Sequence, residues 1–147
     1  MRKKNSWHVW VFSLFLLFIY SMGIYDLFMM LSHNAGYYRS QGYGQEVVNY
    51  FTNYPIYFLV LWVFNLACGF AAPILLILQN KWAKTVALIS VIADFFLLLF
   101  TFAFKNRFHV LGAGVAGFDI FILLLTFAFY LYCIYIYKHT EQNAAQF

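Results

Sequence analysis

Four polar side chains lie within long apolar stretches of this sequence, where polar groups are costly. Asp26, Asp94 and Asp119 are acidic, and Asn65 carries a carboxamide. A charged Asp near the centre of a membrane helix costs about 2.5–3.5 kcal/mol, so such residues usually face a bundle interior or a wet cavity. Asp94 and Asn65 fall near the midplane of their stretches, and the other two acids fall in the outer half. These four residues, here called the polar track, predict a binding or permeation site for a small polar or cationic solute.

Within this hypothesis Asp94 is the deepest acid and a candidate proton carrier. A structural role is the alternative for each acid. A protonated Asp94 could hydrogen-bond to Asn65 or to a backbone carbonyl, because burial favours the neutral form of a carboxyl group. Asp26 and Asp119 could instead pair with outer basic residues, of which the sequence offers Arg39, Lys105 and Arg107.

Two histidines and a tryptophan are candidates for lining an outer pocket. His33 and His109 fall near the outer ends of the apolar stretches, and Trp62 shares a helix face with Asn65. Together with Asp26 and Asp119 the histidines could form a metal site, but spacing alone is weak support and interfacial histidines are the simpler interpretation. No histidine falls near the midplane, so haem ligation is not supported. We therefore expect neither a metal nor a cofactor.

The elements that position these residues are predicted from composition and run length. The 147 residues are 65% hydrophobic and 10% charged, against about 45–50% and 25% in soluble domains. Continuous apolar runs cover residues 7–31, 55–78, 82–104 and 112–137. Each exceeds the roughly 20 residues that a helix needs to cross a bilayer, and none alternates as a barrel strand does. The prediction is an all-α polytopic membrane protein of one domain, residues 1–147, with four transmembrane helices in an antiparallel bundle.

The connection between the first two spans has two parts. Residues 34–44 are rich in turn formers, whereas residues 45–54 place Val47, Tyr50, Phe51 and Tyr54 at helical spacing. This spacing predicts a short amphipathic helix that lies at the outer interface. The first run is too long for a secretory h-region and lacks a small-residue cleavage site, so we expect it to remain as a span.

Small and polar residues form a stripe along three of the spans. Such stripes usually face protein, because lipid-facing positions favour large apolar side chains. The second span has Trp62, Asn65, Gly69 and Ala72; the third has Ala83, Ala87, Ser90, Asp94, Thr101 and Lys105; the fourth has Gly112, Ala116, Asp119, Thr126, Tyr130 and Cys133.

The distribution of basic residues predicts the orientation. One side has six of them and the other has three, which places both termini in the cytoplasm of a bacterial inner membrane. These residues flank helices instead of forming one stripe, so the net charge of +4 does not indicate a nucleic-acid partner. The six are Arg2, Lys3, Lys4, Lys81, Lys84 and Lys138, and the three are Arg39, Lys105 and Arg107.

Residues 75–83 read LLILQNKWA and residues 86–90 read VALIS. These segments resemble small bacterial four-helix membrane proteins that are catalogued as sugar transporters. Residues 25–30, YDLFMM, and residues 54–57, YPIY, are also similar to the pattern of that family. The resemblance covers nearly the whole chain and implies a four-helix fold and a transport function.

The residues thus support three functional hypotheses. The first is a small-solute transporter or binding protein that uses the polar track and assembles as a homo-oligomer or with a partner membrane protein, because four helices enclose little space. The second is a non-enzymatic accessory or structural subunit. The third is a membrane-embedded enzyme that acts on lipid or quinone through the aspartates, since no phosphate loop, zinc signature or nucleophile elbow occurs in the sequence.

Overall fold

The computed structural model describes residues 4–146, and the ordered elements of this range are all α-helices. The four long ones are α1 (Trp7–Leu31), α4 (Ile56–Ile77), α5 (Ala83–Phe104) and α6 (Arg107–Ala145). All four are long and apolar enough to cross a membrane. Two short helices, α2 (Ala35–Ser40) and α3 (Gln45–Phe51), lie between α1 and α4. The predicted all-helical class and the four apolar helices are confirmed.

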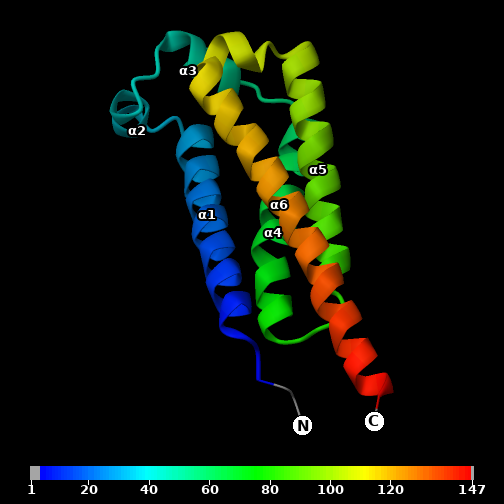
Figure 1. The fold of residues 1–147 in the computed structure, drawn as a ribbon. Coiled ribbons are helices and arrows are strands. Elements are labelled where there is room, and N and C mark those ends of the chain that lie inside the picture. The colour runs from blue at the N-terminus through cyan, green and yellow to red at the C-terminus, as the bar shows by residue number, and fades with distance from the viewer. Residues whose placement is uncertain (1–3, 147) are drawn as a thin grey trace.

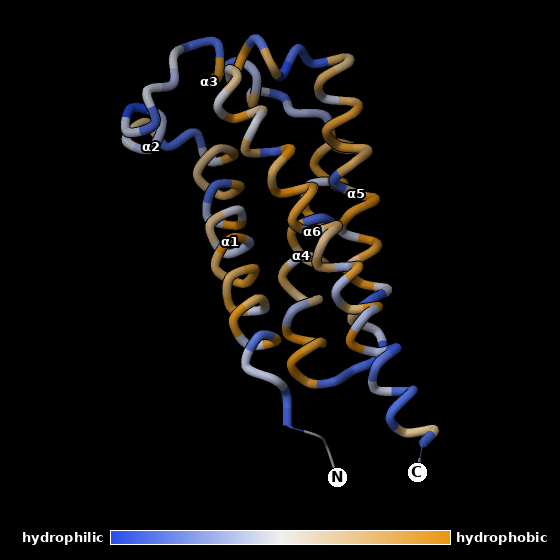
Figure 2. The backbone as a smooth tube through the Cα atoms, viewed as in Figure 1, coloured by the Kyte–Doolittle hydropathy of each residue, from blue (hydrophilic) through white to orange (hydrophobic). Residues whose placement is uncertain are grey.

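The start of α1 and the end of α6 lie at one end of the molecule, here called the terminal end, together with the connection between α4 and α5 (Figure 1). The opposite end, here called the cap end, carries α2, α3 and the connection between α5 and α6 (Figure 1). Apolar residues dominate the long helices and hydrophilic residues gather towards the two ends (Figure 2). Of the basic residues predicted at the terminal side, Arg2 and Lys3 lie outside the described residues.

Hydropathy located α1, α4 and α5 to within one residue, but the segment before α3 differs from the expectation. Residues 35–40 form helix α2 where only turns were expected. Asn34 caps this helix, because its side-chain oxygen accepts a hydrogen bond of 2.9 Å from the Tyr37 backbone N–H. Helix α3 ends at Phe51, three residues before the predicted limit of 54.

The last helix is longer than the apolar run that predicted it. It begins at Arg107, is interrupted at Gly112 and continues to Ala145. Gly112 has φ +86° and ψ +171°, a backbone conformation that essentially only glycine adopts, and α6 kinks at this residue. The segment beyond Tyr137 is polar but rich in helix-forming residues, so α6 continues past the end of the apolar run.

The long helices pack in sequence, with α1 on α4, α4 on α5 and α5 on α6. Two clusters of buried side chains form the interior. The larger one includes Leu16, Ala72, Ala83, Ala87 and Phe129. The second lies at the cap end and joins α3 to the start of α6; it consists of Met30, Tyr38, Val47, Tyr50, Phe51 and Leu111.

The predicted stripe of the third span is confirmed over most of its length. Ala83, Ala87, Ser90 and Thr101 are fully buried, and Asp94 is 5% exposed. Lys105 alone is only half-buried, at the end of α5. The opposite faces of the long helices expose large apolar side chains, as contact with lipid requires; examples are Phe18, Phe28, Phe64, Phe118 and Leu124.

Candidate functional site

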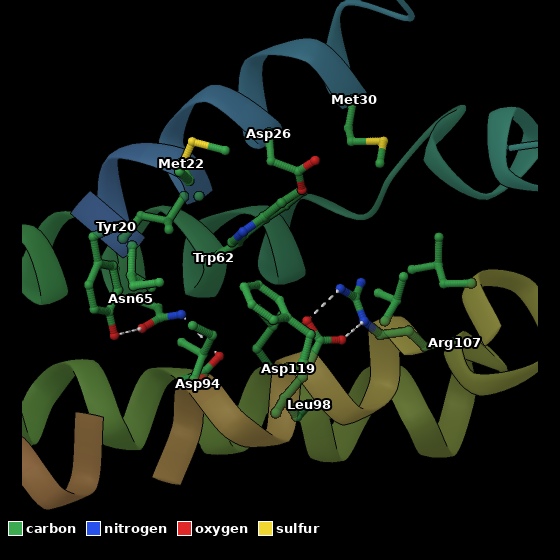
Figure 3. A pocket seen from close by; sticks show the side chains of 18 of the residues that line it. Tyr20, Met22, Asp26, Met30, Trp62, Asn65, Asp94, Leu98, Arg107 and Asp119 are labelled. Atoms are coloured by element: carbon green, nitrogen blue, oxygen red, sulfur yellow. Dashed lines mark hydrogen bonds and ion pairs between the residues drawn. The ribbon is translucent and has the colours of Figure 1, made fainter. Parts of the chain in front are cut away.

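A cavity of about 370 Å³ lies between the four long helices and reaches the cap end. This volume is within the roughly 300–1,000 Å³ range of small-molecule sites. All four residues of the polar track, Asp26, Asn65, Asp94 and Asp119, line this one cavity. Trp62 lines it as well, and Figure 3 shows its side chain between those of Asp26 and Asn65. The sequence-predicted residues therefore come from α1, α4, α5 and α6 to a common space.

The deep end of the cavity is closed by a buried network of hydroxyl and amide groups that joins all four long helices. The Tyr20 hydroxyl oxygen lies 2.5 Å from Thr126 Oγ1, 3.3 Å from Ser90 Oγ and 3.5 Å from Asn65 Oδ1. The Thr126 hydroxyl itself donates to the Ile122 carbonyl. Such a network holds its members in one arrangement, because each polar group would be costly without its partner.

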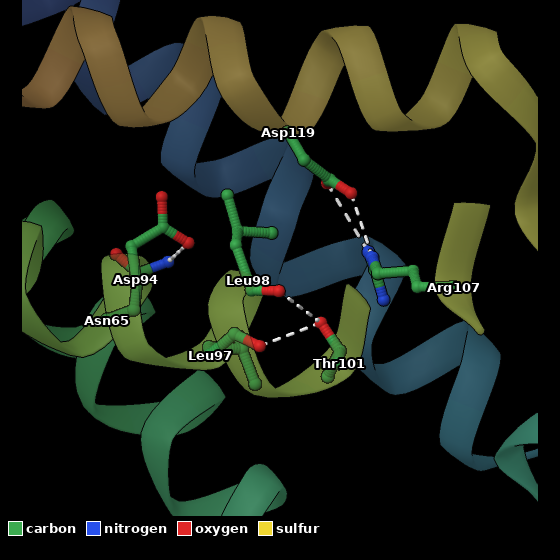
Figure 4. Close-up of polar contacts among 7 residues, drawn as sticks. All are labelled: Asn65, Asp94, Leu97, Leu98, Thr101, Arg107 and Asp119. Atoms are coloured by element: carbon green, nitrogen blue, oxygen red, sulfur yellow. Dashed lines mark hydrogen bonds and ion pairs between the residues drawn. The ribbon is translucent and has the colours of Figure 1, made fainter. Parts of the chain in front are cut away.

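Asn65 is oriented by this network. Its Oδ1 accepts a hydrogen bond of 2.8 Å from the Ser90 hydroxyl, which an amide nitrogen could not do. The amide Nδ2 therefore faces the other way and donates to Asp94 Oδ1 at 3.0 Å (Figure 4). The other Asp94 oxygen, Oδ2, is buried and has no hydrogen-bond partner among residues 4–146. Asp94 thus presents one satisfied and one unsatisfied oxygen.

Asp119 lies closer to the cap end and is paired. Arg107 Nε donates to Asp119 Oδ2 at 2.8 Å, and Nη2 donates to Oδ1 at 3.3 Å (Figure 4). The two side chains are 13% and 18% exposed. In a straight helix, residues 12 positions apart would be separated by roughly 18 Å. The kink at Gly112 folds the first turn of α6 back, which allows Arg107 to reach Asp119.

Asp26 has a tyrosine as its partner. The Tyr37 hydroxyl donates a hydrogen bond to Asp26 Oδ1, and the Tyr37 ring also packs edge-on against Tyr25. Burial, and then the hydrogen bond to Asp26, raise the pKa of the Tyr37 hydroxyl above its ordinary value. This tyrosine therefore stays protonated and acts as a donor, and it attaches α2 to the cap-end part of α1.

An aromatic layer covers the cavity at the cap end. Phe51 and Tyr54 pack against Trp62, with ring centroids 5.9 and 6.1 Å away. The Lys105 ammonium lies 5.2 Å from the centroid of the Tyr50 ring. Burial raises the pKa of the Tyr50 and Tyr54 hydroxyls, and the nearby Arg107 charge acts in the opposite direction.

The two histidines expected at an outer pocket are not part of this cavity. His33 is exposed and has φ +54°, because it takes the left-handed position that ends α1. His109 is exposed on the first turn of α6. Trp62, the third residue of that expectation, does line the cavity. Within residues 4–146 no group of three or more His, Cys, Asp or Glu side chains could hold a metal ion.

Sequence reasoning missed three residues of the site. Tyr20 was not singled out, because one tyrosine in a chain with 12 carries no distinguishing signal. Tyr37 fell in a segment expected to be turns. Arg107 was considered only as one of three basic residues that could pair with an acid, because the Gly112 kink that selects it cannot be located from hydropathy.

Comparison with known proteins adds no relative to this description. No protein-family model, no curated protein and no solved structure matches the chain.

Proposed function

We propose that this protein binds a small polar or cationic solute within the membrane and transports it. The observation that supports the proposal is the convergence of Asp26, Asn65, Asp94 and Asp119 on one cavity between four helices that are apolar enough to span a bilayer. Ionisable residues inside membrane spans usually mark substrate or ion pathways. The resemblance of residues 75–83 to small proteins catalogued as sugar transporters points in the same direction.

The proposal includes a placement in the membrane. The four long helices form an antiparallel bundle in a bacterial inner membrane, with both termini in the cytoplasm and α3 at the outer interface. The supporting observations are the excess of basic residues at the terminal side and the amphipathic sequence of α3. In this orientation the cavity lies under the outer surface, and Asp94 is its deepest acid.

Each part of the site has a role in this proposal. Asp94 receives the solute and is the candidate proton carrier, because one of its oxygens has no hydrogen-bond partner in the described part of the chain. The Arg107–Asp119 pair and the Asp26–Tyr37 pair flank the entrance side. A second copy of the chain, or a partner membrane protein, covers the exposed apolar faces and completes the path that four helices alone enclose only in part.

Uptake by the purified protein in lipid vesicles tests this function. The solutes are radiolabelled glucose and a panel of small organic cations, and a pH-sensitive dye inside the vesicles reports proton movement. We expect uptake above that of empty vesicles, and a loss of about tenfold or more with Asp94→Asn, because truncating a buried charged contact costs 2 kcal/mol or more. Glu46→Gln is the matched control, since it makes the same chemical change at an exposed site.

Two results would contradict the proposal. One is uptake by the parent protein that Asp94→Asn leaves unchanged. The other is the absence of uptake for every solute by protein that is folded and monodisperse. Uptake that appears only after a second membrane protein is added would favour the accessory-subunit hypothesis instead.

A further inference from the structure

The Oδ2 oxygen of Asp94 receives no hydrogen bond from residues 4–146. Asn65 already donates to the other oxygen, and its orientation is set by Ser90. Tyr20 is engaged with Thr126, and Thr126 donates to a backbone carbonyl. Asp94 is 5% exposed as a residue and lines the cavity. An unsatisfied buried oxygen of this kind requires a hydrogen-bond donor from the cavity side.

The balance of charge in the cavity indicates which donor this is. Three carboxylates and one guanidinium line the cavity. The guanidinium of Arg107 is used by Asp119, and Asp26 accepts from the Tyr37 hydroxyl. Asp26 and Asp94 have no cationic partner among residues 4–146, and of these two acids only Asp94 has a buried oxygen without a hydrogen-bond partner. A cationic donor would satisfy both the unpaired oxygen and the charge, whereas a hydroxyl would satisfy the oxygen alone.

The walls around Asp94 indicate what the rest of the ligand is like. Leu66, Leu97, Leu98 and Ile122 line the same cavity as the acid. Trp62 supplies an aromatic wall (Figure 3). These side chains offer few polar atoms, so they suit an apolar body. A divalent metal ion is a poor fit, because Ca²⁺ takes about 6–8 oxygen ligands and Mg²⁺ about six. A carboxylate or phosphate ligand would be repelled by the acids.

We propose that the ligand of this cavity is an organic ammonium ion with an apolar or aromatic body, and that its ammonium group binds Asp94 Oδ2 while its body packs against Trp62 and the neighbouring leucines. This inference rests on the proposed solute-binding function and specifies its substrate class. It also assigns a role to Trp62, since an aromatic face attracts organic cations.

Three probes of nearly equal size test the inference: 2-phenylethylamine, 2-phenylethanol and phenylacetate, which are cationic, neutral and anionic at neutral pH. Binding to the purified full-length protein in detergent is measured by calorimetry and by the shift in melting temperature. We expect the amine to bind about tenfold or more tightly than the alcohol, and the anion to bind least. Asp94→Asn abolishes the preference for the amine, whereas Asp94→Glu keeps part of it and Glu46→Gln leaves it unchanged.

The outcomes separate this inference from the proposed function. Equal binding of the amine and the alcohol, or an amine preference that survives in Asp94→Asn protein of unchanged circular dichroism, overturns the ammonium assignment. Asp94-dependent uptake of glucose without binding of the amine also overturns it, although the transport function then stands. Binding of the amine through Asp94 without any uptake supports the ligand class and contradicts transport.

Discussion

The two halves of this helical bundle are built from the same four helices but are packed in different ways. In the terminal half, small residues such as Ala72, Ala83 and Ala87 are at most 1% exposed and allow the helices to approach closely. Phe129 fills the remaining space there and packs edge-on against Phe12. In the cap half the same helices carry the polar track and enclose an open cavity.

The hydrogen-bond inventory differs between the halves in the same way. Around Tyr20, where the halves meet, the network connects hydroxyl and amide groups from all four helices. On the cap side of this network, Asp94 Oδ2 and the hydroxyls of Tyr50 and Tyr54 are buried without hydrogen-bond partners among the described residues, whereas in the terminal half this holds for Ser13 Oγ alone. Unsatisfied polar atoms reduce stability, so their greater number beside the cavity indicates that the cap half serves binding and that the other supplies most of the stability.

The largest effect is expected where the packed half is tightest. A side chain at Gly69 would collide with the Tyr20 ring and displace it from its hydrogen-bond partners. Overpacking a core costs about 1–3 kcal/mol, occasionally more, so Gly69→Leu should lower the free energy of unfolding in detergent by about 3 kcal/mol. Gly117→Leu is the control, because Gly117 has open space around it. Equal stability of the two variants would contradict the contrast between the halves.

The next effect concerns the ion pair at the cavity. Arg107→Gln leaves Asp119 without its two charge-assisted hydrogen bonds. We expect a loss of about 2–3 kcal/mol, less than for a fully buried pair because the two side chains are 13% and 18% exposed. The double variant Arg107→Gln/Asp119→Asn should recover part of it, since no unpaired charge remains. Arg39→Gln, an exposed control, should lie within about 0.5 kcal/mol of the parent.

A smaller effect is expected from the kink that makes this ion pair accessible. Gly112→Ala forces a side chain into a backbone conformation that costs about 1–2 kcal/mol. If α6 straightens to relieve the strain, Arg107 moves away from Asp119 and spin labels on α3 and α6 report a changed distance. Gly114→Ala, in helical backbone with open space, should not destabilise the protein or change the distance. If Gly112→Ala changes neither the spin-label distance nor the free energy of unfolding, the kink at Gly112 is contradicted.

The smallest effect concerns the link between α2 and α1. Tyr37→Phe removes the hydroxyl that donates to Asp26 and should cost about 1 kcal/mol. Because the pKa of Tyr37 is raised in the folded protein, its contribution is present below the ordinary tyrosine value of 10.0 and is lost as the pH rises above it. Unfolding measured between neutral and strongly alkaline pH should therefore show a shallower loss of stability in Tyr37→Phe. Identical pH profiles would rule out this contribution.

The long helices could be predicted from the sequence because apolar run length is a direct physical requirement of a membrane span. Residues 7–31 are helical as predicted, whereas α2 was missed because Gly36 and Gly42 suggested turns and the Asn34 cap outweighed them. The start of α6 was missed because Gly112 kinks the helix without ending it. Local periodicity contains no information about such a break.

The site was predictable only in part. Buried acids are costly enough that Asp26, Asp94 and Asp119 stand out in any apolar run, and Asn65 stands out with them. Their partners could not be predicted, because the choice of Arg107 over other basic residues depends on tertiary structure. His33 was expected to line an outer pocket, but it takes the left-handed position that ends α1 and is exposed.

The position of a bound ammonium ligand tests the central claim most directly. An experimental structure of the full-length protein with 2-(4-bromophenyl)ethylamine would locate the bromine by its anomalous signal. We predict bromine density between Trp62 and Leu98, with the ammonium group at hydrogen-bond distance from Asp94 Oδ2. Bromine at the protein surface only, or an empty cavity at a ligand concentration that saturates binding, would contradict the account.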